Sequence, residues 1–213
     1  MSSESIILYH VSDLTTPITA KRDEVYSQRD EKYSEYYIAV VDAFVFNTQG
    51  EMLLQRRAKH KKTSPGLLHT AVAWHIDPGD TAEFTMFHEC LEEIGVPCGF
   101  AQEGESFFDQ VKKLKPFLEK MAFLKLYKHY RKDFVHVDQN YSFLSRDDTH
   151  TFFGVFSGSP VCLDDSVEEF VWITLENLDE KILKNKADLT MYFVSHYAGL
   201  RSELYAFRDE LIG

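Results

Sequence analysis

Three glutamates lie close together near the middle of the 213-residue chain, at Glu89, Glu92 and Glu93. If this segment is helical, spacings of three and four residues place the three carboxylates on one side of the helix. Like charges at these spacings destabilise a helix by roughly a few tenths of a kcal/mol per pair, unless a cation lies among them. Carboxylate oxygens are hard ligands that suit Mg²⁺ or Mn²⁺. We therefore expect a metal site here; the alternative is an acidic helix face exposed to solvent.

The residues around the glutamates predict a tight turn followed by a helix. Asp77-Pro78-Gly79 predicts the turn, and the helix is expected over about residues 81–94. Asp80 and Glu83 have the spacing of a capping box, in which each side chain accepts a hydrogen bond from a backbone N–H group of the first turn. Gly95 is expected to end the helix, because glycine adopts the left-handed conformation at least cost.

The same helix should also present an apolar side to the protein core. At about 100° per residue, several apolar residues gather nearly opposite the glutamates. They are Phe84, Phe87, Cys90, Leu91 and Ile94. One face is therefore expected to be buried and the other to carry the carboxylates.

The spacing of residues 74–96 resembles the Nudix box. That motif is a glycine, five residues, a glutamate, seven residues, Arg-Glu, an aliphatic residue, any residue, Glu-Glu, any residue, a glycine and an aliphatic residue. The matching positions are Glu89, Glu92, Glu93, Gly95 and Val96, with Pro78-Gly79 at the usual turn. The resemblance implies the Nudix fold and hydrolysis of a diphosphate linked to another group, usually in a nucleoside diphosphate derivative, with Mg²⁺ or Mn²⁺ as cofactor.

The resemblance also implies a role for each glutamate. Glu89, Glu92 and Glu93 would hold the metal, which neutralises diphosphate charge and lowers the pKa of an attacking water. Glu92 or Glu93, or an acidic residue in a later loop, would accept the proton. The expected catalytic residues are therefore Glu92 and Glu93.

Three positions depart from the box, and each bears on the expected rate. His88 replaces the arginine; it is shorter and offers no guanidinium fork. Asp80 replaces the first glutamate, keeping the charge but reaching less far. Trp74 replaces the first glycine, which lets a metal or substrate approach the backbone closely. Its ring could narrow the site, offer a stacking surface or belong to the core.

A basic loop precedes the box in an otherwise acidic chain. Its five cations fall within seven residues, at Arg56, Arg57, Lys59, Lys61 and Lys62. Arginine offers a planar fork for phosphate oxygens and lysine a point charge. We expect Arg56, Arg57 and Lys61 to bind substrate phosphates; the alternative is a solvated loop that serves solubility.

A second resemblance is to the Nudix branch that includes isopentenyl-diphosphate isomerase. The segments FNTQGEMLLQRRAKHKKTSPG and LDDSVEEFVWITLENL carry it, and with the box it covers residues 37–97 and 150–178. The isomerase chemistry is not implied, because the catalytic cysteine of that family would fall at Ala73. Its metal ligands would fall near Ile38, Thr149 and Thr151, and only His75 matches. The isomerase is therefore the least favoured function.

The rest of the chain fits one α/β (α+β) domain over residues 1–213: a Nudix fold with a mixed β-sheet sandwiched between helices. Apolar residues recur at three and four between Phe107 and Leu124, so residues 99–132 are expected to be a helical insertion. The aromatic residues of this insertion also make a homodimer an expectation. Strands are expected at 5–10, 37–46, 52–55, 68–74, 134–137, 149–156 and 167–174, and one or two helices at 178–212. Residues 20–36 are expected to be a solvated connector.

The charge and the cysteines limit the classes of partner. A formal net charge of −11 disfavours nucleic acid polymers and anionic membranes, whereas a small diphosphate can still bind through a metal. Cys90, Cys98 and Cys162 form no CxxC pair and no zinc spacing. Without a long apolar run, a cytoplasmic protein is expected.

The leading hypothesis is a metal-dependent diphosphate hydrolase; the alternative is a catalytically degenerate Nudix domain that binds a nucleotide or a protein partner.

Overall fold

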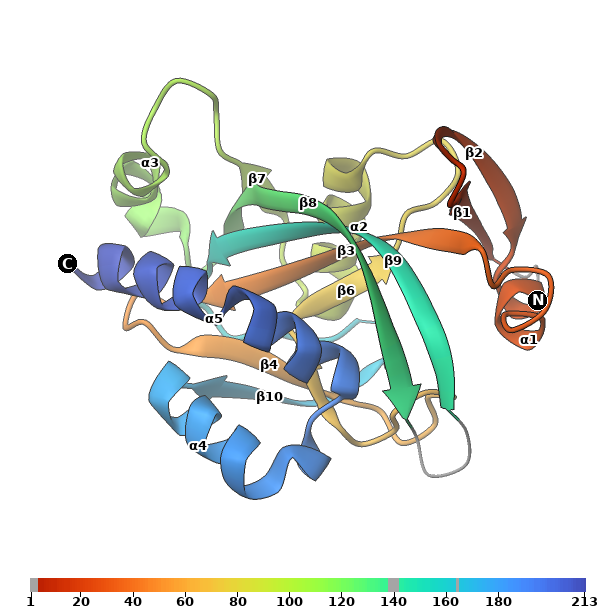
Figure 1. Cartoon of the computed structure of the whole chain (residues 1–213). Coiled ribbons are helices and arrows are strands. Elements are labelled where there is room, and N and C mark those ends of the chain that lie inside the picture. Colours follow the sequence, from red (N-terminus) through yellow and green to blue (C-terminus); the bar gives the residue numbers. More distant parts are fainter. Residues whose placement is uncertain (1–3, 138–141, 164) are drawn as a thin grey trace.

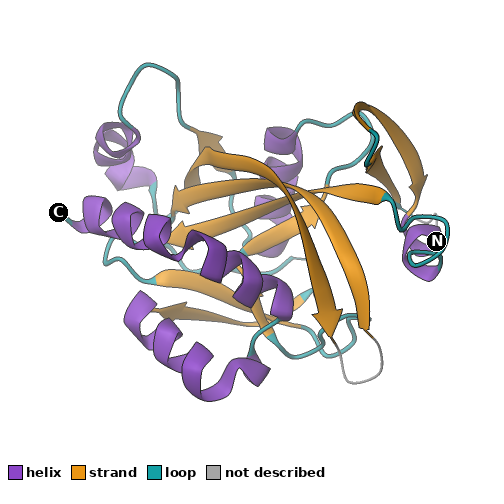
Figure 2. Ribbon diagram, viewed as in Figure 1, coloured by secondary structure: helices purple, strands orange, loops and turns teal. Residues whose placement is uncertain are grey.

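The computed structural model describes residues 4–137, 142–163 and 165–213, which form a mixed β-sheet with helices on both sides (Figures 1 and 2). The strands are β1 (Ser5–His10), β2 (Asp13–Lys21), β3 (Tyr36–Phe46), β4 (Met52–Arg57), β5 (Leu68–Thr70), β6 (Val72–His75), β7 (Cys98–Phe100), β8 (Ala122–Val137), β9 (Ser142–Val155) and β10 (Val167–Ile173). The α-helices are α1 (Arg22–Ser27), α2 (Ala82–Glu93), α3 (Phe107–Leu114), α4 (Leu175–Asn185) and α5 (Met191–Ile212). The expected class, a mixed sheet between helices, is confirmed.

Strand β3 is the centre of the sheet. The main order is β10-β4-β3-β9-β8-β7, and β3 also pairs with β1 and β6 outside that path. The β3–β9 and β7–β8 pairs are parallel, and the other pairs are antiparallel. Residues 38–46 of β3 are all buried, which explains why this strand is rich in β-branched and aromatic residues.

Alternation along β3 assigns its side chains to two hydrophobic clusters on opposite faces of the sheet. Ala39, Val41, Ala43 and Val45 pack in one cluster with Met86 and Cys90 of α2. Phe44 and Phe46 pack in the other with Phe193, Tyr197 and Phe207 of α5. In Figure 1, α5 accordingly crosses in front of the sheet while α2 lies behind it.

The helical insertion expected over residues 99–132 is wrong for most of its length. Helix α3 and a single 3₁₀ turn, Lys115–Phe117, account for the helical part. Residues from Ala122 onward form β8, which pairs along its length with β9. Residues with helical apolar spacing therefore belong to a strand, because pairing with β9 overrides the local pattern.

The N-terminal segment also differs from expectation. Residues 13–21, for which no strand is predicted, form β2, which pairs with β1, and the connector expected over residues 20–36 contains α1. None of the helices in the described part of the chain has the length and apolar character that crossing a lipid bilayer requires.

Candidate functional site

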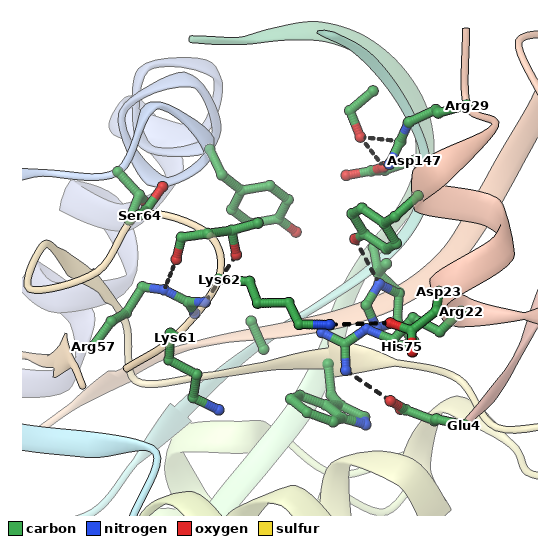
Figure 3. Close-up of a pocket in the computed structure, with 18 of the residues that line it drawn as sticks. Glu4, Arg22, Asp23, Arg29, Arg57, Lys61, Lys62, Ser64, His75 and Asp147 are labelled. Carbon is green, nitrogen blue, oxygen red and sulfur yellow. Dashed lines mark hydrogen bonds and ion pairs between the residues drawn. The ribbon is translucent and has the colours of Figure 1, made fainter. Parts of the chain in front are cut away.

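A cavity of about 1190 Å³ opens between α1, the basic loop, β6 and the start of α5 (Figure 3). Cationic and aromatic side chains dominate its lining. They are Arg22, Tyr26, Arg29, Arg57, His60, Lys61, Lys62, His69, Trp74, His75 and Tyr192. Acidic residues, including Glu4, Asp23 and Asp147, also line it. Arg57 and Lys61, on the side of the basic loop, suit an anionic group, and the rings of Trp74 and Tyr192 offer surfaces for a planar one.

Two of the three expected phosphate-binding residues line this cavity. Arg57 is held in place because its Nε donates to the Thr63 carbonyl oxygen at 3.1 Å. Lys61 lies beside it, and Lys62 reaches across the cavity to within 3.4 Å of Asp23 (Figure 3). These three basic groups come from the last residue of β4 and the loop that follows it, so they can contact one ligand together.

The third expected residue, Arg56, is directed elsewhere. Its guanidinium lies 3.0 Å from a carboxylate oxygen of Glu169 and 2.8 Å from one of Asp188. It also donates to the Gly66 carbonyl oxygen at 2.9 Å. Successive residues of a strand point to opposite faces, which is why Arg56 and Arg57 separate. Arg56 ties β4 to β10 and to the segment before α5.

Trp74 lines the cavity and also packs against the hydrophobic cluster that contains α2. The Arg22 guanidinium carbon lies 4.8 Å from the ring centroid, and Lys61 Nζ lies 5.6 Å from it. Cations at these distances are attracted to the negative face of the indole. The tryptophan at the box glycine position is thus part of the wall of the cavity.

His75, beside Trp74, is buried and neutral. Its Nε2 lies 3.0 Å from the Tyr26 hydroxyl. Burial, reinforced by the charges of Arg22 and Arg29, lowers the pKa of His75 from 6.5 to about 3. The histidine therefore contributes a neutral polar surface to the cavity at physiological pH.

One acidic residue of the lining, Asp147, is buried. Asp147 accepts a hydrogen bond from Ser145 Oγ at 2.7 Å and lies 3.7 Å from the Arg29 guanidinium. Burial raises the pKa of the Asp147 carboxyl, and the Arg29 charge opposes that rise. Arg22, Tyr26 and Arg29 are cavity residues that the sequence did not indicate, because nothing in the charged segment 20–36 predicts that it folds back over β6.

The three glutamates of α2 have different environments. Glu89 and Glu93 are 6% and 4% exposed, whereas Glu92 is exposed. The alternative of an acidic helix face exposed to solvent therefore does not hold for Glu89 and Glu93. The predicted buried face is confirmed for Cys90 and Ile94, whereas Phe84 is 49% exposed, with its ring centroid 4.5 Å from that of His88.

Glu93 connects the helix to the cavity. Its Oε2 accepts a hydrogen bond of 3.0 Å from the backbone N–H of Ala73, a residue that lines the cavity. Burial raises the pKa of Glu93 from 4.5 to about 7, while the Ala73 hydrogen bond and the charges of Arg57 and Lys61 oppose the rise. The hydrogen bond from β6 thus holds the Glu93 carboxylate in a buried position, near the charges of Arg57 and Lys61.

The ends of α2 partly follow the sequence prediction. Gly95 has φ +73° after the last helical turn, as expected, and a Cβ there would lie 2.4 Å from the Val161 carbonyl oxygen. The predicted capping box at Asp80 is wrong. Thr81 is the N-cap, and its hydroxyl accepts from the backbone N–H of Phe84 at 3.2 Å.

The residues of the box fit a hard divalent cation. Glu89 and Glu93 are two buried carboxylates one turn apart, and the raised pKa of Glu93 means that nearby groups do not fully offset the cost of its charge. A cation would supply that compensation. In the described residues the three glutamates do not converge within 4.8 Å, so Glu92 would join by rotation of its exposed side chain.

The positions compared with the isomerase are spread over both the cavity and the core. Ala73 and His75 line the cavity. Ile38, Thr149 and Thr151 are buried. The cavity wall thus presents an alanine methyl group where the isomerase resemblance would require a thiol.

Comparison with known proteins agrees with this geometry. A family model described as "NUDIX domain" matches residues 36–193. Isopentenyl-diphosphate Delta-isomerase 2 of Aromatoleum aromaticum is 26% identical over 144 residues, covering 68% of this chain and 62% of that protein. A Nudix hydrolase of Deinococcus radiodurans is 33% identical over 89 residues, covering 40% of this chain and 52% of that protein. The chain therefore matches less than two thirds of the length of either relative.

Solved structures show the same fold. The protein DR0079 from Deinococcus radiodurans superposes with a TM-score of 0.53 at 18% identity, covering 85% of this chain and 90% of the other. The NUDIX domain of Shewanella oneidensis NrtR, in complex with ADP ribose, superposes with a TM-score of 0.51 at 16% identity, covering 87% and 99%. Because the family model spans well over half of the residues, this chain belongs to the NUDIX domain family.

Proposed function

We propose that the protein is a metal-dependent hydrolase that cleaves the diphosphate linkage of a nucleoside diphosphate derivative. One observation carries the proposal: the buried Glu93 carboxylate of the box accepts a hydrogen bond from Ala73, which lines the same cavity as Arg57, Lys61 and Trp74, and Glu93 interacts with the charges of Arg57 and Lys61. A catalytic carboxylate, phosphate-binding cations and an aromatic surface are thereby adjacent. These are the groups that hydrolysis of such a substrate needs.

The basic loop and Trp74 would bind the two ends of the substrate. Arg57 offers a fork that matches phosphate oxygens, and Lys61 and Lys62 add point charges. Trp74 offers a ring on which a nucleobase stacks, in place of the cations that now lie over it. This division would orient the diphosphate towards Glu93.

Glu89 and Glu93 would hold Mg²⁺ or Mn²⁺, with Glu92 completing the set from the solvent side. The bound metal would neutralise diphosphate charge and lower the pKa of the attacking water. Glu93, with a pKa of about 7 in the metal-free protein, or Glu92 would accept the proton. Asp80 and His88, like the three glutamates, do not line the cavity, and we assign them no role in this proposal.

A second function, binding without turnover, is favoured by two specific observations. Trp74 occupies part of the cavity wall where the box has glycine, and the three glutamates do not converge within the described residues. A nucleotide-binding domain would keep the basic loop and the aromatic wall without needing the metal. Turnover is the property that separates the two functions.

The test is to incubate the purified protein with Mg²⁺ or Mn²⁺ and a panel of nucleoside diphosphate derivatives. The panel includes ADP-ribose, because the structurally similar NrtR domain was solved with it. Phosphate-containing products are measured beside a Glu92→Gln and Glu93→Gln double variant. Metal-dependent turnover that the variant lacks supports the hydrolase. Binding of a panel member by calorimetry, without turnover above the variant, supports the binding domain and contradicts the hydrolase.

A further inference from the structure

A second group of potential metal ligands lies on β8 and β9, the long antiparallel pair that curves across the front of the molecule in Figure 1. His129, Asp148 and His150 each bring one ligand atom within 4.8 Å of the other two. In the described residues this is the one set of three histidine, cysteine or acidic groups that converges so closely. The strand register explains it, because His129 is paired with His150, and Asp148 lies two residues from His150 on the same face.

This cluster is separate from the cavity. Asp147 lines the cavity, so its neighbour Asp148 points to the opposite face of the sheet. Phe152, which shares the face of His150, packs in the cluster that contains α2. A cation bound here would therefore lie on the face of the sheet opposite to Asp147, on the side of α2, and would use ligands other than Glu89 and Glu93.

The contacts within the cluster bring the ligands together. His129 Nε2 lies 2.8 Å from Asp148 Oδ1, and the two imidazole rings stack with centroids 3.9 Å apart. Asp148 is 2% exposed as a side chain and His129 is 42% exposed. The exposed His129 lies between solvent and the buried Asp148 carboxylate, so a cation can bind His129 first and then contact Asp148.

Two further features bear on whether the cluster binds a metal. His150 Nδ1 is buried and, in the described residues, has no hydrogen-bond partner, a condition that costs roughly 1–3 kcal/mol. A metal or a water that it carries would give this nitrogen a partner. Against this, Arg131 Nε lies 2.9 Å from the same Asp148 oxygen, so a cation has to compete with a fixed positive charge.

We propose that His129, Asp148 and His150 form a second metal site, which takes a divalent transition-metal ion such as Zn²⁺. Two imidazoles and one carboxylate suit zinc and its neighbours better than Mg²⁺ or Ca²⁺, which take oxygen ligands. Two ligand atoms on a tetrahedral zinc, each about 2.1 Å from the metal, lie about 3.4 Å apart. The present spacing of at most 4.8 Å therefore closes by small side-chain rotations. Three protein ligands leave a fourth position for water.

The proposal is tested by titrating the metal-stripped, full-length protein with Zn²⁺ in a calorimeter. A Glu89→Gln and Glu93→Gln double variant removes the box site, so any remaining zinc belongs elsewhere. One Zn²⁺ is expected to bind this variant. Adding His150→Ala is expected to weaken binding at least about 10-fold, the low end of the loss seen when even an outer partner of a metal ligand is removed. Excess Mg²⁺ is expected not to compete.

His10→Ala is the matched control, because His10 is a β1 histidine that also lies near a carboxylate, with Nε2 3.6 Å from Glu35. It should leave zinc affinity unchanged. His129→Ala, at a largely exposed strand position, serves if His150→Ala does not fold as judged by circular dichroism. Absence of zinc binding in the double variant, or equal affinity after loss of His129 or His150, would overturn the proposal. Neither result depends on whether the protein hydrolyses a diphosphate.

Discussion

Changing Glu93 to glutamine should stabilise the metal-free protein, and the gain should grow with pH. The pKa of Glu93 is about 7 in the folded state, against 4.5 for an ordinary glutamate carboxyl in the unfolded chain. Below pH 4.5 both folded and unfolded states hold the proton, so burial of the side chain carries no charge penalty. As pH rises from 4.5 to 7, the unfolded state ionises first and the folded state becomes relatively less stable.

The size of the effect follows from the same two values. A difference of one in pKa corresponds to about 1.4 kcal/mol, so the full penalty above pH 7 is about 3 kcal/mol. Glutamine is neutral throughout and can still accept the hydrogen bond from Ala73 N–H. We expect Glu93→Gln to match the wild type near pH 4.5 and to exceed its free energy of unfolding by up to about 3 kcal/mol at pH 8.

The assay is urea denaturation with EDTA present, at several pH values between 4.5 and 8. Glu92→Gln is the control, because it removes an exposed charge from the same helix and should show little pH-dependent gain. Mg²⁺ should then stabilise the wild type at pH 8 more than it stabilises Glu93→Gln. A Glu93→Gln variant whose stability follows the wild type at every pH would refute the assignment of Glu93 as a buried, undercompensated carboxylate.

Three further predictions concern the cavity. Trp74→Ala should weaken binding of a nucleoside diphosphate derivative by about 1–3 kcal/mol, measured by calorimetry, while Trp74→Phe should keep most of the affinity; equal affinity in Trp74→Ala would show that the ring does not contact the base. The pKa of His75 is about 3 in the folded state and 6.5 in the unfolded state, so up to about 5 kcal/mol of the free energy of unfolding is lost as pH falls from 6.5 to 3. His75→Gln should remove this part of the acid dependence. An acid profile unchanged by the substitution would contradict burial of a neutral histidine. Arg29→Met should lower the free energy of unfolding by about 3–5 kcal/mol, because it leaves the buried Asp147 without its cation, and a loss below 1 kcal/mol in urea denaturation would contradict that pairing.

The box shows what local sequence can and cannot specify. The position of α2 followed from the turn before it and from Gly95, whose positive φ is a local backbone property. The burial of Cys90 and Ile94 also followed from the periodicity, whereas the environments of Phe84 and Glu93 did not. Hydrophobic periodicity placed Phe84 inside and Glu93 outside, yet the open edge of β6 draws Glu93 inward through the Ala73 N–H. That edge comes from distant pairing with β3, which periodicity within one helix does not reveal.

Of the residues that line the cavity, those of the basic loop could be predicted from the sequence, and those of the α1 segment could not. The basic loop indicated phosphate contacts for Arg57 and Lys61, which line the cavity, and for Arg56, which pairs with Glu169 and Asp188 instead. The opposite wall comes from α1, in a segment with no apolar stripe. Its placement depends on contacts such as Tyr26 with His75, 49 residues away in sequence.

The long β8–β9 pair shows the same limit. Apolar residues at spacings of three and four continue from α3 into β8, so the sequence pattern alone indicates a longer helix. The strand forms because β9 supplies a partner along its length. The same pairing brings His129 and His150 together, which their separation in sequence does not indicate.

The most direct test of the central claim is the rate of Mg²⁺-dependent cleavage of ADP-ribose, or of the best substrate in the panel, by the wild type and by Glu93→Gln. We predict turnover by the wild type that EDTA abolishes, and a loss of at least about 100-fold in Glu93→Gln, the upper end of the loss expected even for an outer partner of a metal ligand. Equal rates in the two proteins, or no turnover by the wild type with any diphosphate despite binding, would contradict a hydrolytic site at Glu93.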